Sequence, residues 1–552
     1  MITMRPFCIP ICVLSLSRTS IKPHRSQNVP MGLNTSPGVF FVCCAQRAGY
    51  GTIESLKNEK CGAAAFFMDE NMRLQSRAGG KGTAVLMEPT TTERKENIMG
   101  TRPVNGLLVS MAVPLMLSML VQALYNIVDS VFVSMVSEAA LTSVSLIFPV
   151  QNLMIAVAAG TGVGLNALLS RRLGEKSYEE ANHVAENGVF LILISWAVTA
   201  VLGALFSDAF LRAFTSDPEI AAMGAAYMRI CTIFSFGLYL QITFERILQV
   251  TGKTVYPMIS QMSGAVINII LDPVMIFGLC GVPKMGVAGA AWATVIGQIG
   301  GMCIGIALNH CKNHEVRMHF AGFRPSRQII RGIYAVGVPS IIMQSIGSVM
   351  VFGMNKILIA FTKTAVSVFG VYFKLQSFVF MPVFGISNAL IPIVGYNYGA
   401  RRPRRIHQTL HMAMILSLAI MAAGTAVFEL APRWLLSLFS ASDAMYEVGV
   451  PALRILAVPF CVAGVAICCS SMFQALGDGM LSLIISAVRQ LAFLLPAAWL
   501  LARMGGLHAV WWSFPIAEAA SITVTLLFVL RVRRRKLDPM EREENARSHA
   551  EK

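Results

Sequence analysis

The chain has 552 residues, of which 55% are hydrophobic and only 13% are charged. Because soluble globular proteins carry about a quarter of charged residues, this sequence has too few charges to cover a surface that faces water. The 45 Lys and Arg residues exceed the 29 Asp and Glu residues, and the net charge is +16. This excess lies in short loops between apolar runs, such as RRLGEK and ARRPRR, which is typical of membrane proteins and argues against nucleic-acid binding.

Twelve apolar runs begin at residue 104, and each is long enough to cross a bilayer as a helix, which takes about 20 residues. The runs predict an all-α integral membrane protein with twelve transmembrane helices, embedded in a lipid bilayer. The expected spans are 104–132, 139–169, 187–207, 220–242, 256–279, 285–309, 329–358, 363–397, 408–431, 446–472, 480–503 and 508–531.

Basic residues are distributed unequally between alternate loops. The loop set that includes both ends of the membrane region carries 22 Lys and Arg residues, and the other set carries 5. Basic loops stay on the cytoplasmic side of a membrane. We therefore expect a multi-pass protein in the plasma (inner) membrane of a bacterium, with both termini in the cytoplasm.

Residues 1–100 do not share this pattern, because their apolar runs, such as 7–16, are too short to cross a bilayer. We expect them to form a disordered tail, most of which would be absent if synthesis started at Met87. At the other end, residues 536–552 are expected to form a charged cytoplasmic tail.

The second half of the membrane region repeats the first half at an offset of 225 residues. The matched pairs include Pro114 with Pro339, Gly160 with Gly385, Gly174 with Gly399 and Arg229 with Arg454. We expect an N-lobe at 101–312 and a C-lobe at 329–535, each of six helices, joined by a cytoplasmic loop at 313–328. An even number of spans per repeat predicts two parallel bundles that enclose a central cleft and alternate their access to the two sides.

Acidic residues inside a span are costly and are functional candidates. Asp129 lies in the first span, and Asp272 lies in the fifth span four residues after Asn268. This spacing places the amide and the carboxylate on one helix face, and Pro273 frees an upstream carbonyl. We expect Asp129, Asn268 and Asp272 to bind a coupling ion, Na⁺ or H⁺, although a buried Asp can also serve only to join helices.

Further polar residues within the spans are candidates for the lining of the cleft. They are Gln122, Asn126, Gln151, Gln298, Gln344, Lys374, Gln376 and Glu518. Glu518 takes the place of Gln298 in the repeat. Lys356, Lys374 and Arg489 either pair with an acid or face the cleft.

Several classes of function lack their motifs. GxxxxGK[ST] is absent, so ATP binding within this chain is not expected, and HExxH and GxSxG are absent too. The 12 cysteines contain no pair with metal-ligand spacing, so no metal is expected beyond Na⁺. We expect no enzyme and no cofactor, and an ion gradient remains as the source of energy.

Several segments together resemble the multidrug and toxic compound extrusion (MATE) family over about residues 90–535. They are MAVPLMLSMLVQALYNIVDSVFV, ERILQVTGKTVYPM, NIILDPVMIFGLCGVPKMGVAGAAWATVIGQ, FKLQSFVFMPVFGISNALIPIVGYNYGARR and FQALGDG. The fourth segment most resembles a MepA-like bacterial branch. The resemblance implies a two-lobed antiporter that exports organic cations against Na⁺ or H⁺, with Asp129, Asn268, Asp272 and Thr294 in the ion site.

Two other functions stay open at this stage. The first is a lipid-linked precursor flippase or metabolite exporter of the same superfamily, for which an Arg-rich cleft would be expected. The second is an integral membrane enzyme, which would need a nucleophile and base or a metal cluster. We expect the protein to be a monomer whose partners are small organic cations and lipid.

Overall fold

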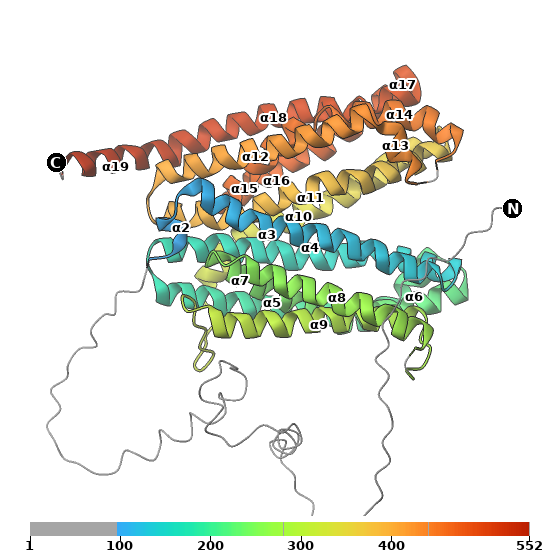
Figure 1. Ribbon diagram of the computed structural model, residues 1–552, viewed down its shortest axis with the longest axis horizontal. Coiled ribbons are helices and arrows are strands. Elements are labelled where there is room, and N and C mark those ends of the chain that lie inside the picture. Colours follow the sequence, from blue (N-terminus) through green and yellow to red (C-terminus); the bar gives the residue numbers. More distant parts are fainter. Residues whose placement is uncertain (1–95, 280, 440, 551–552) are drawn as a thin grey trace, which may run out of the picture. The chain divides into compact units, whose positions relative to one another are not determined.

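The computed structural model describes residues 96–279, 281–439 and 441–550, which fold into helices joined by short loops (Figure 1). Residues 1–95, including Met87, lie outside the described residues. The first half contains α2 (Ile98–Thr101), α3 (Val104–Ser134), α4 (Glu138–Gly174), α5 (Tyr178–Phe214), α6 (Pro218–Ile233), α7 (Phe236–Val250), α8 (Val255–Phe277) and α9 (Val287–Lys312). The second half contains α10 (Arg327–Ile359), α11 (Lys363–Gly399), α12 (Pro403–Leu430), α13 (Pro432–Ser437), α14 (Asp443–Ala457), α15 (Phe460–Ala475), α16 (Gly479–Ala487), α17 (Leu495–Val510), α18 (Ser513–Val532) and α19 (Asp538–Ala550), with π-helices η2 (Val488–Leu494) and η3 (Arg533–Leu537).

Within the described residues, ten helices or continuous helical stretches are long and apolar enough to cross a membrane. Two further spans are each made of a bent pair: α6 and α7 meet at 41°, and α14 and α15 meet at 46°. With each pair counted as one span, the structure has the twelve predicted spans, and the predicted all-α membrane fold is confirmed. The two bends lie 225 residues apart, so both repeats break the same span at the same point.

Helix caps repeat at the same offset. The Ser137 hydroxyl accepts a hydrogen bond from the backbone N–H of Ala140 at 3.0 Å and caps α4. The Thr362 hydroxyl does the same for Ala365 at 3.0 Å and caps α11. A side-chain oxygen at this position satisfies an N–H that has no partner within the helix. The repeat is therefore written into the helix boundaries as well as into the apolar runs.

The two halves of the chain pack along a seam that glycines make possible. A Cβ at Gly174 on α4 would lie 2.0 Å from the carbonyl oxygen of Tyr396 on α11, which is far inside a normal contact. A Cβ at Gly399 would lie 2.2 Å from the carbonyl oxygen of Arg171. Tyr396 and Arg171 are themselves 225 residues apart. The seam is therefore nearly symmetric between the repeats, and both glycines are needed for the backbones to touch.

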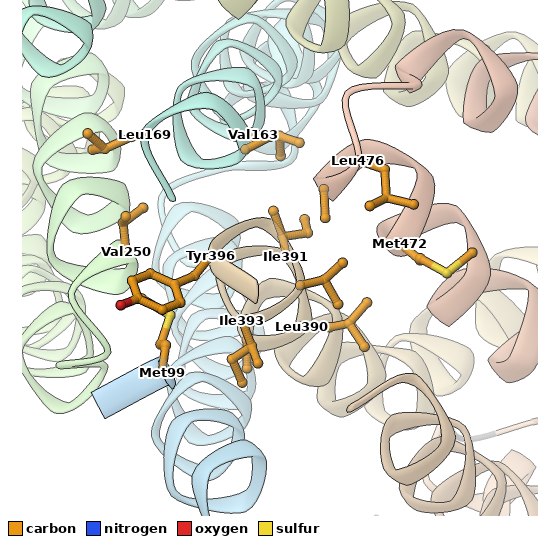
Figure 2. Packing of buried hydrophobic residues seen from close by; sticks show 14 of the residues in the cluster. Met99, Val163, Leu169, Val250, Leu390, Ile391, Ile393, Tyr396, Met472 and Leu476 are labelled. Carbon is orange, nitrogen blue, oxygen red and sulfur yellow. The ribbon is translucent and has the colours of Figure 1, made fainter. Parts of the chain in front are cut away.

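A shared hydrophobic core lies along this seam. It joins residues of α4, α11 and α15 with Met99 of α2, and Figure 2 shows part of it. On α4 the buried residues concentrate between 154 and 174, and on α11 they concentrate between 382 and 397. We call the end of the bundle that carries the basic loops the basic end. Burial is therefore heaviest in the half of each helix that leads to the basic end.

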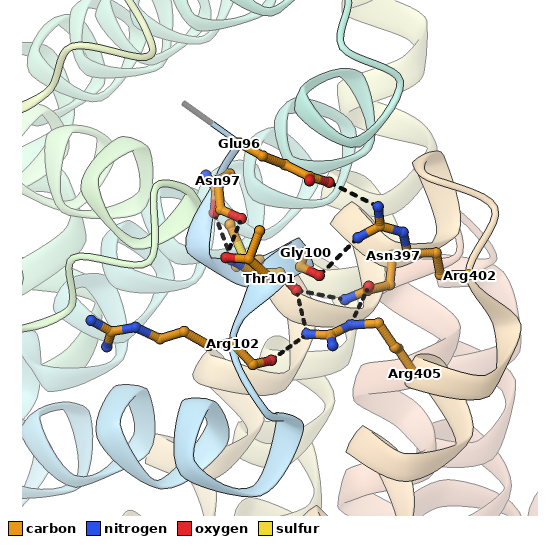
Figure 3. Close-up of polar contacts among 9 residues, drawn as sticks. Glu96, Asn97, Gly100, Thr101, Arg102, Asn397, Arg402 and Arg405 are labelled. Atoms are coloured by element: carbon orange, nitrogen blue, oxygen red, sulfur yellow. Dashed lines mark hydrogen bonds and ion pairs between the residues drawn. The ribbon is translucent and has the colours of Figure 1, made fainter. Parts of the chain in front are cut away.

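Two arginines reinforce the seam at the basic end (Figure 3). Arg402 donates to the carbonyl oxygen of Gly100 at 2.7 Å and to Glu96 Oε1 at 2.9 Å. Arg405 donates to the carbonyl oxygen of Arg102 at 2.7 Å. We call this contact the arginine clasp. Residues 96–102 were expected to end a disordered tail and to start the first lobe, and the structure instead binds them to the loop before α12.

The C-terminal segment is also ordered by charge. Residues 536–552 were expected to form a tail, but α19 covers most of them. Arg401 pairs with Glu543 at 2.6 Å, and His407 pairs with Glu541 at 3.1 Å. α19 therefore packs against the same basic loop that forms the arginine clasp.

Between α9 and α10, the connecting loop folds back onto the basic end. Glu315 accepts a hydrogen bond from the side-chain amide of Asn97. Burial raises the pKa of Glu315 above its ordinary value, although the Asn97 amide and the nearby Lys253 favour its charged form. The loop thus holds a carboxyl group in surroundings that disfavour its ionisation.

Candidate ion site in the N-lobe

The candidate site begins on α8, where Asn268 and Asp272 are one turn apart. The Asn268 amide donates to Asp272 Oδ1 at 3.3 Å, as their spacing predicts. Asp272 is fully buried and Asn268 is 3% exposed. Pro273 lies inside the helix and removes the N–H that would bond to the carbonyl of Ile269. One face of α8 therefore presents a carboxylate, an amide and a carbonyl with a free lone pair.

Thr294 reaches this face because α8 and α9 approach closely. A Cβ at Gly297 on α9 would lie 2.7 Å from the carbonyl oxygen of Gly264 and 3.0 Å from the Asn268 Cβ. With glycine there, the Asn268 amide lies 3.4 Å from the Thr294 hydroxyl. The structure thus brings together the three residues that α8 and α9 contribute to the expected ion site.

Asp129 completes the group from α3. Its carboxylate is near enough to Asp272 for the two negative charges to repel each other. Three buried oxygens of the site have no hydrogen-bond partner: Asp129 Oδ1, Asn268 Oδ1 and Asp272 Oδ2. Neither carboxylate forms an ion pair with Lys, Arg or His of the described residues. Because buried charges are normally paired, the site has a strong demand for a cation.

The donor set determines which cation fits. Carboxylate, amide, hydroxyl and carbonyl oxygens are hard ligands, which suit Na⁺, and the paired carboxylates can also share a proton. Among the described residues, no three His, Cys, Asp or Glu side chains lie together as a transition-metal site would require. The residues present therefore fit Na⁺ or H⁺.

Two residues on neighbouring helices surround Asp129. Gln151 on α4 was expected in the cleft, and its amide donates to the Tyr227 hydroxyl on α6 at 3.2 Å. Tyr227 is 1% exposed and lies within electrostatic range of Asp129. The sequence analysis missed Tyr227, because a tyrosine in an apolar span carries no signal of its own.

The other residues expected in the cleft fall into two groups. Gln122 is bound within the N-lobe, where it accepts a hydrogen bond from the Gln261 amide at 2.8 Å. The remaining ones outside the C-lobe ion pair described below are exposed or half-buried, and their side chains form no hydrogen bond with other described residues: Asn126, Gln298, Gln344, Lys374 and Gln376. Their place in a cleft stays a prediction.

The corresponding region of the C-lobe is neutralised internally. Glu518 on α18 is 7% exposed and pairs with Arg489 Nη1 at 3.5 Å. Arg489 lies in the π-helix η2, a rare geometry that occurs often at functional sites. Of the two open readings of Arg489, the structure favours pairing with an acid. Glu518 was expected in the cleft and instead lies buried beside an arginine.

Two buried charges on α7 were also missed. Glu245 accepts hydrogen bonds from Gln241 and Ser260 at 3.1 and 3.2 Å. Arg246 donates to Asn388 of α11 at 2.8 Å, so it joins the two halves of the chain. The sequence analysis ended the fourth span at 242 and counted Arg246 as a loop residue. The polar pair in FERILQ was the available signal, because it precedes the loop by a full helical turn.

Comparisons with known proteins agree with this architecture. A family model described as MatE matches residues 114–274 and again 339–500, which is the repeat found in the sequence. The multidrug export protein MepA of Staphylococcus haemolyticus is 25% identical over 426 residues, covering 77% of this chain and 93% of that protein. MepA of Staphylococcus aureus is 23% identical over 434 residues, covering 78% and 95%.

Solved structures are similar as well. An outward-facing multidrug resistance MATE transporter of the MOP superfamily is 27% identical, with a TM-score of 0.75, and the match covers 81% of this chain and 99% of that one. A MOP superfamily transporter from Pyrococcus furiosus, whose reversed binding-pocket polarity suggests a different function, is 28% identical with a TM-score of 0.74, covering 80% and 98%. The double match of the family model and these likenesses confirm the resemblance seen in the sequence, and the chain belongs to the MatE family of membrane transporters.

Proposed function

We propose that this protein exports organic cations in exchange for Na⁺ or H⁺ by alternating access of its two lobes. The observation that carries the proposal is the pair of buried carboxylates in the N-lobe, Asp129 and Asp272, which have unpartnered oxygens and no basic partner. A bound cation would compensate them. The drug export named for the MepA relatives, and for the outward-facing MATE structure, supports the choice of cargo.

Alternating access follows from where the lobes touch. The seam at Gly174 and Gly399 and the arginine clasp lie at the basic end, and opening toward that side must break both. The structure has the features of a state that is closed at the basic end. With basic loops on the cytoplasmic side, this end faces the cytoplasm, the termini lie there, and the closed seam is the inner gate of a plasma-membrane exporter.

Coupling requires that ion and drug weaken each other's binding by the same factor. Ion binding at Asp129 and Asp272 removes negative charge from the N-lobe, so an organic cation held nearby loses attraction. Conversely, a bound drug opposes entry of the ion. Exchange then proceeds because each ligand favours release of the other.

The test uses purified protein in liposomes and follows efflux of a fluorescent organic cation. A Na⁺ gradient and a pH gradient are imposed separately on wild type, Asp129→Asn and Asp272→Asn. Glu219→Gln, which removes an exposed carboxylate on α6, is the matched control. We expect one gradient to drive efflux in wild type and in the control, and neither gradient in the two Asp variants. Equal efflux in all four proteins would refute the proposal.

Lys374 favours a second candidate, the export of an anionic or lipid-linked metabolite. It lies in the middle of α11, is exposed, and forms no ion pair with the other described residues. Efflux of an anionic dye that fails in Lys374→Gln, with no cation transport in wild type, would support this candidate over the first.

A further inference from the structure

A cavity of about 540 Å³ opens at the basic end of the second half of the chain. One wall comes from α10, including Val338, and another comes from the start of α16, including Met480. The end of α18 and the π-helix η3 supply Arg531 and Arg535. The cavity is separate from the ion site, which lies in the first half of the chain.

The cavity carries two arginines that no acid balances. Lys536 also lines it, but Lys536 pairs with Asp478 at 2.8 Å and donates to the carbonyl oxygen of Leu476 at 3.0 Å. Arg531 and Arg535 are exposed, and neither pairs with a carboxylate of the described residues. The lining therefore has a net positive charge concentrated on two guanidinium groups, which suit bidentate binding of a phosphate.

The helix geometry places these cations together. α18 is regular up to Val532, and η3 then continues as a π-helix with bonds between residues five apart. Arg531 and Lys536, which are five residues apart, thereby line the same cavity. A π-helix is rare and often marks a functional site, so the change of winding at this point agrees with a binding role.

The remaining lining is apolar and accessible. Val338 is 43% exposed and Met480 is 54% exposed, and both belong to membrane-spanning stretches. In a bilayer, such side chains contact acyl chains, while Arg531 at the end of its span lies at the level of the headgroups. The cavity thus combines a charged end and an apolar wall in the order in which a phospholipid presents its phosphate and its chains.

We propose that this cavity binds an acidic phospholipid from the leaflet on the basic side. Arg531 and Arg535 bind the anionic headgroup, and Val338 and Met480 contact an acyl chain. Basic pockets between transmembrane helices select anionic headgroups, with about a 1 kcal/mol gain for each cation near the surface. A zwitterionic lipid lacks the net charge that two unbalanced arginines favour.

The test measures lipid binding by the purified full-length protein with native mass spectrometry. Phosphatidylglycerol and phosphatidylcholine with the same chains are compared on wild type and on Arg531→Gln/Arg535→Gln. The matched control is Arg324→Gln/Arg534→Gln, which removes two exposed arginines that lie outside the cavity. We expect phosphatidylglycerol to bind about 30-fold more weakly to the first double variant and less than about threefold more weakly to the control.

Two further arms test the shape and the source of the ligand. Val338→Trp keeps both arginines but fills the cavity, and we expect it to lose phosphatidylglycerol binding as well. Inorganic phosphate at millimolar concentration is expected not to displace the lipid. Equal losses in both double variants, equal binding of phosphatidylcholine, unchanged binding in Val338→Trp, or displacement by free phosphate would each overturn the proposal.

Discussion

Replacing Asp272 with Asn is expected to stabilise the ion-free protein, which is the opposite of what most core substitutions do. Asp272 is fully buried, its Oδ2 has no partner, and Asp129 repels it. Asn has the same shape, keeps an oxygen that accepts from Asn268, and gains an amide that can donate to Asp129. The substitution therefore removes a buried unpaired charge and supplies a missing hydrogen bond.

The magnitude follows from the unpartnered atom. A buried acceptor without a partner costs about 1–3 kcal/mol, and a charged one costs more. We expect the free energy of unfolding of Asp272→Asn to exceed that of wild type by about 2 kcal/mol when no Na⁺ is present and the pH is high. Wild type gains stability as the coupling ion is added, by about 2.7 kcal/mol at one hundred times its Kd, whereas the variant gains none.

The assay is denaturant unfolding in detergent micelles, followed by tryptophan fluorescence, across a series of Na⁺ concentrations and a series of pH values. Glu219→Gln serves as the control, because it removes an exposed carboxylate and should respond to the ion as wild type does. A variant that is less stable than wild type without ion, or that keeps the full response to the ion, would refute this reasoning.

Three more predictions concern other parts of the molecule. Gly174→Val places side-chain atoms against the carbonyl oxygen of Tyr396, so spin labels at the basic ends of the two lobes should move apart, and an unchanged distance would count against the seam as a gate. Arg489→Gln leaves Glu518 as a buried charge without a partner and should cost about 3 kcal/mol of stability, whereas adding Glu518→Gln should restore most of it; a double variant as unstable as the single one would contradict this. Because burial raises the pKa of Glu315, ionisation removes stability as the pH rises through the folded-state pKa, so Glu315→Gln should raise the melting temperature at pH 7 and lose that advantage toward pH 4, and a constant difference would exclude this cause.

The apolar runs predicted the spans well, because a bilayer imposes a length on each helix that can be read directly from composition. The break between α14 and α15 lies at Val458 and Pro459, and a proline marks such a point. The break between α6 and α7 lies at Phe234 and Ser235, where neither proline nor glycine occurs. Only the repeat relates the second break to the first.

The candidate ion site could be predicted in part. The spacing of Asn268 and Asp272 fixes their common face, because a helix places residues four apart side by side. Thr294 entered through the family resemblance, since its contact with Asn268 depends on the approach of α8 to α9 at Gly297. No spacing rule relates Arg489 to Glu518 across two helices, so that ion pair needed the fold.

The central claim is that drug and ion compete through the N-lobe carboxylates, and the most direct measurement is ion release upon drug binding. Purified protein is loaded with the coupling ion, an organic cation is added, and released Na⁺ or H⁺ is measured together with bound drug. The account predicts release that rises with occupancy in wild type and is lost in both Asp129→Asn and Asp272→Asn. Drug binding with no release in wild type, or with equal release in those variants, would contradict it.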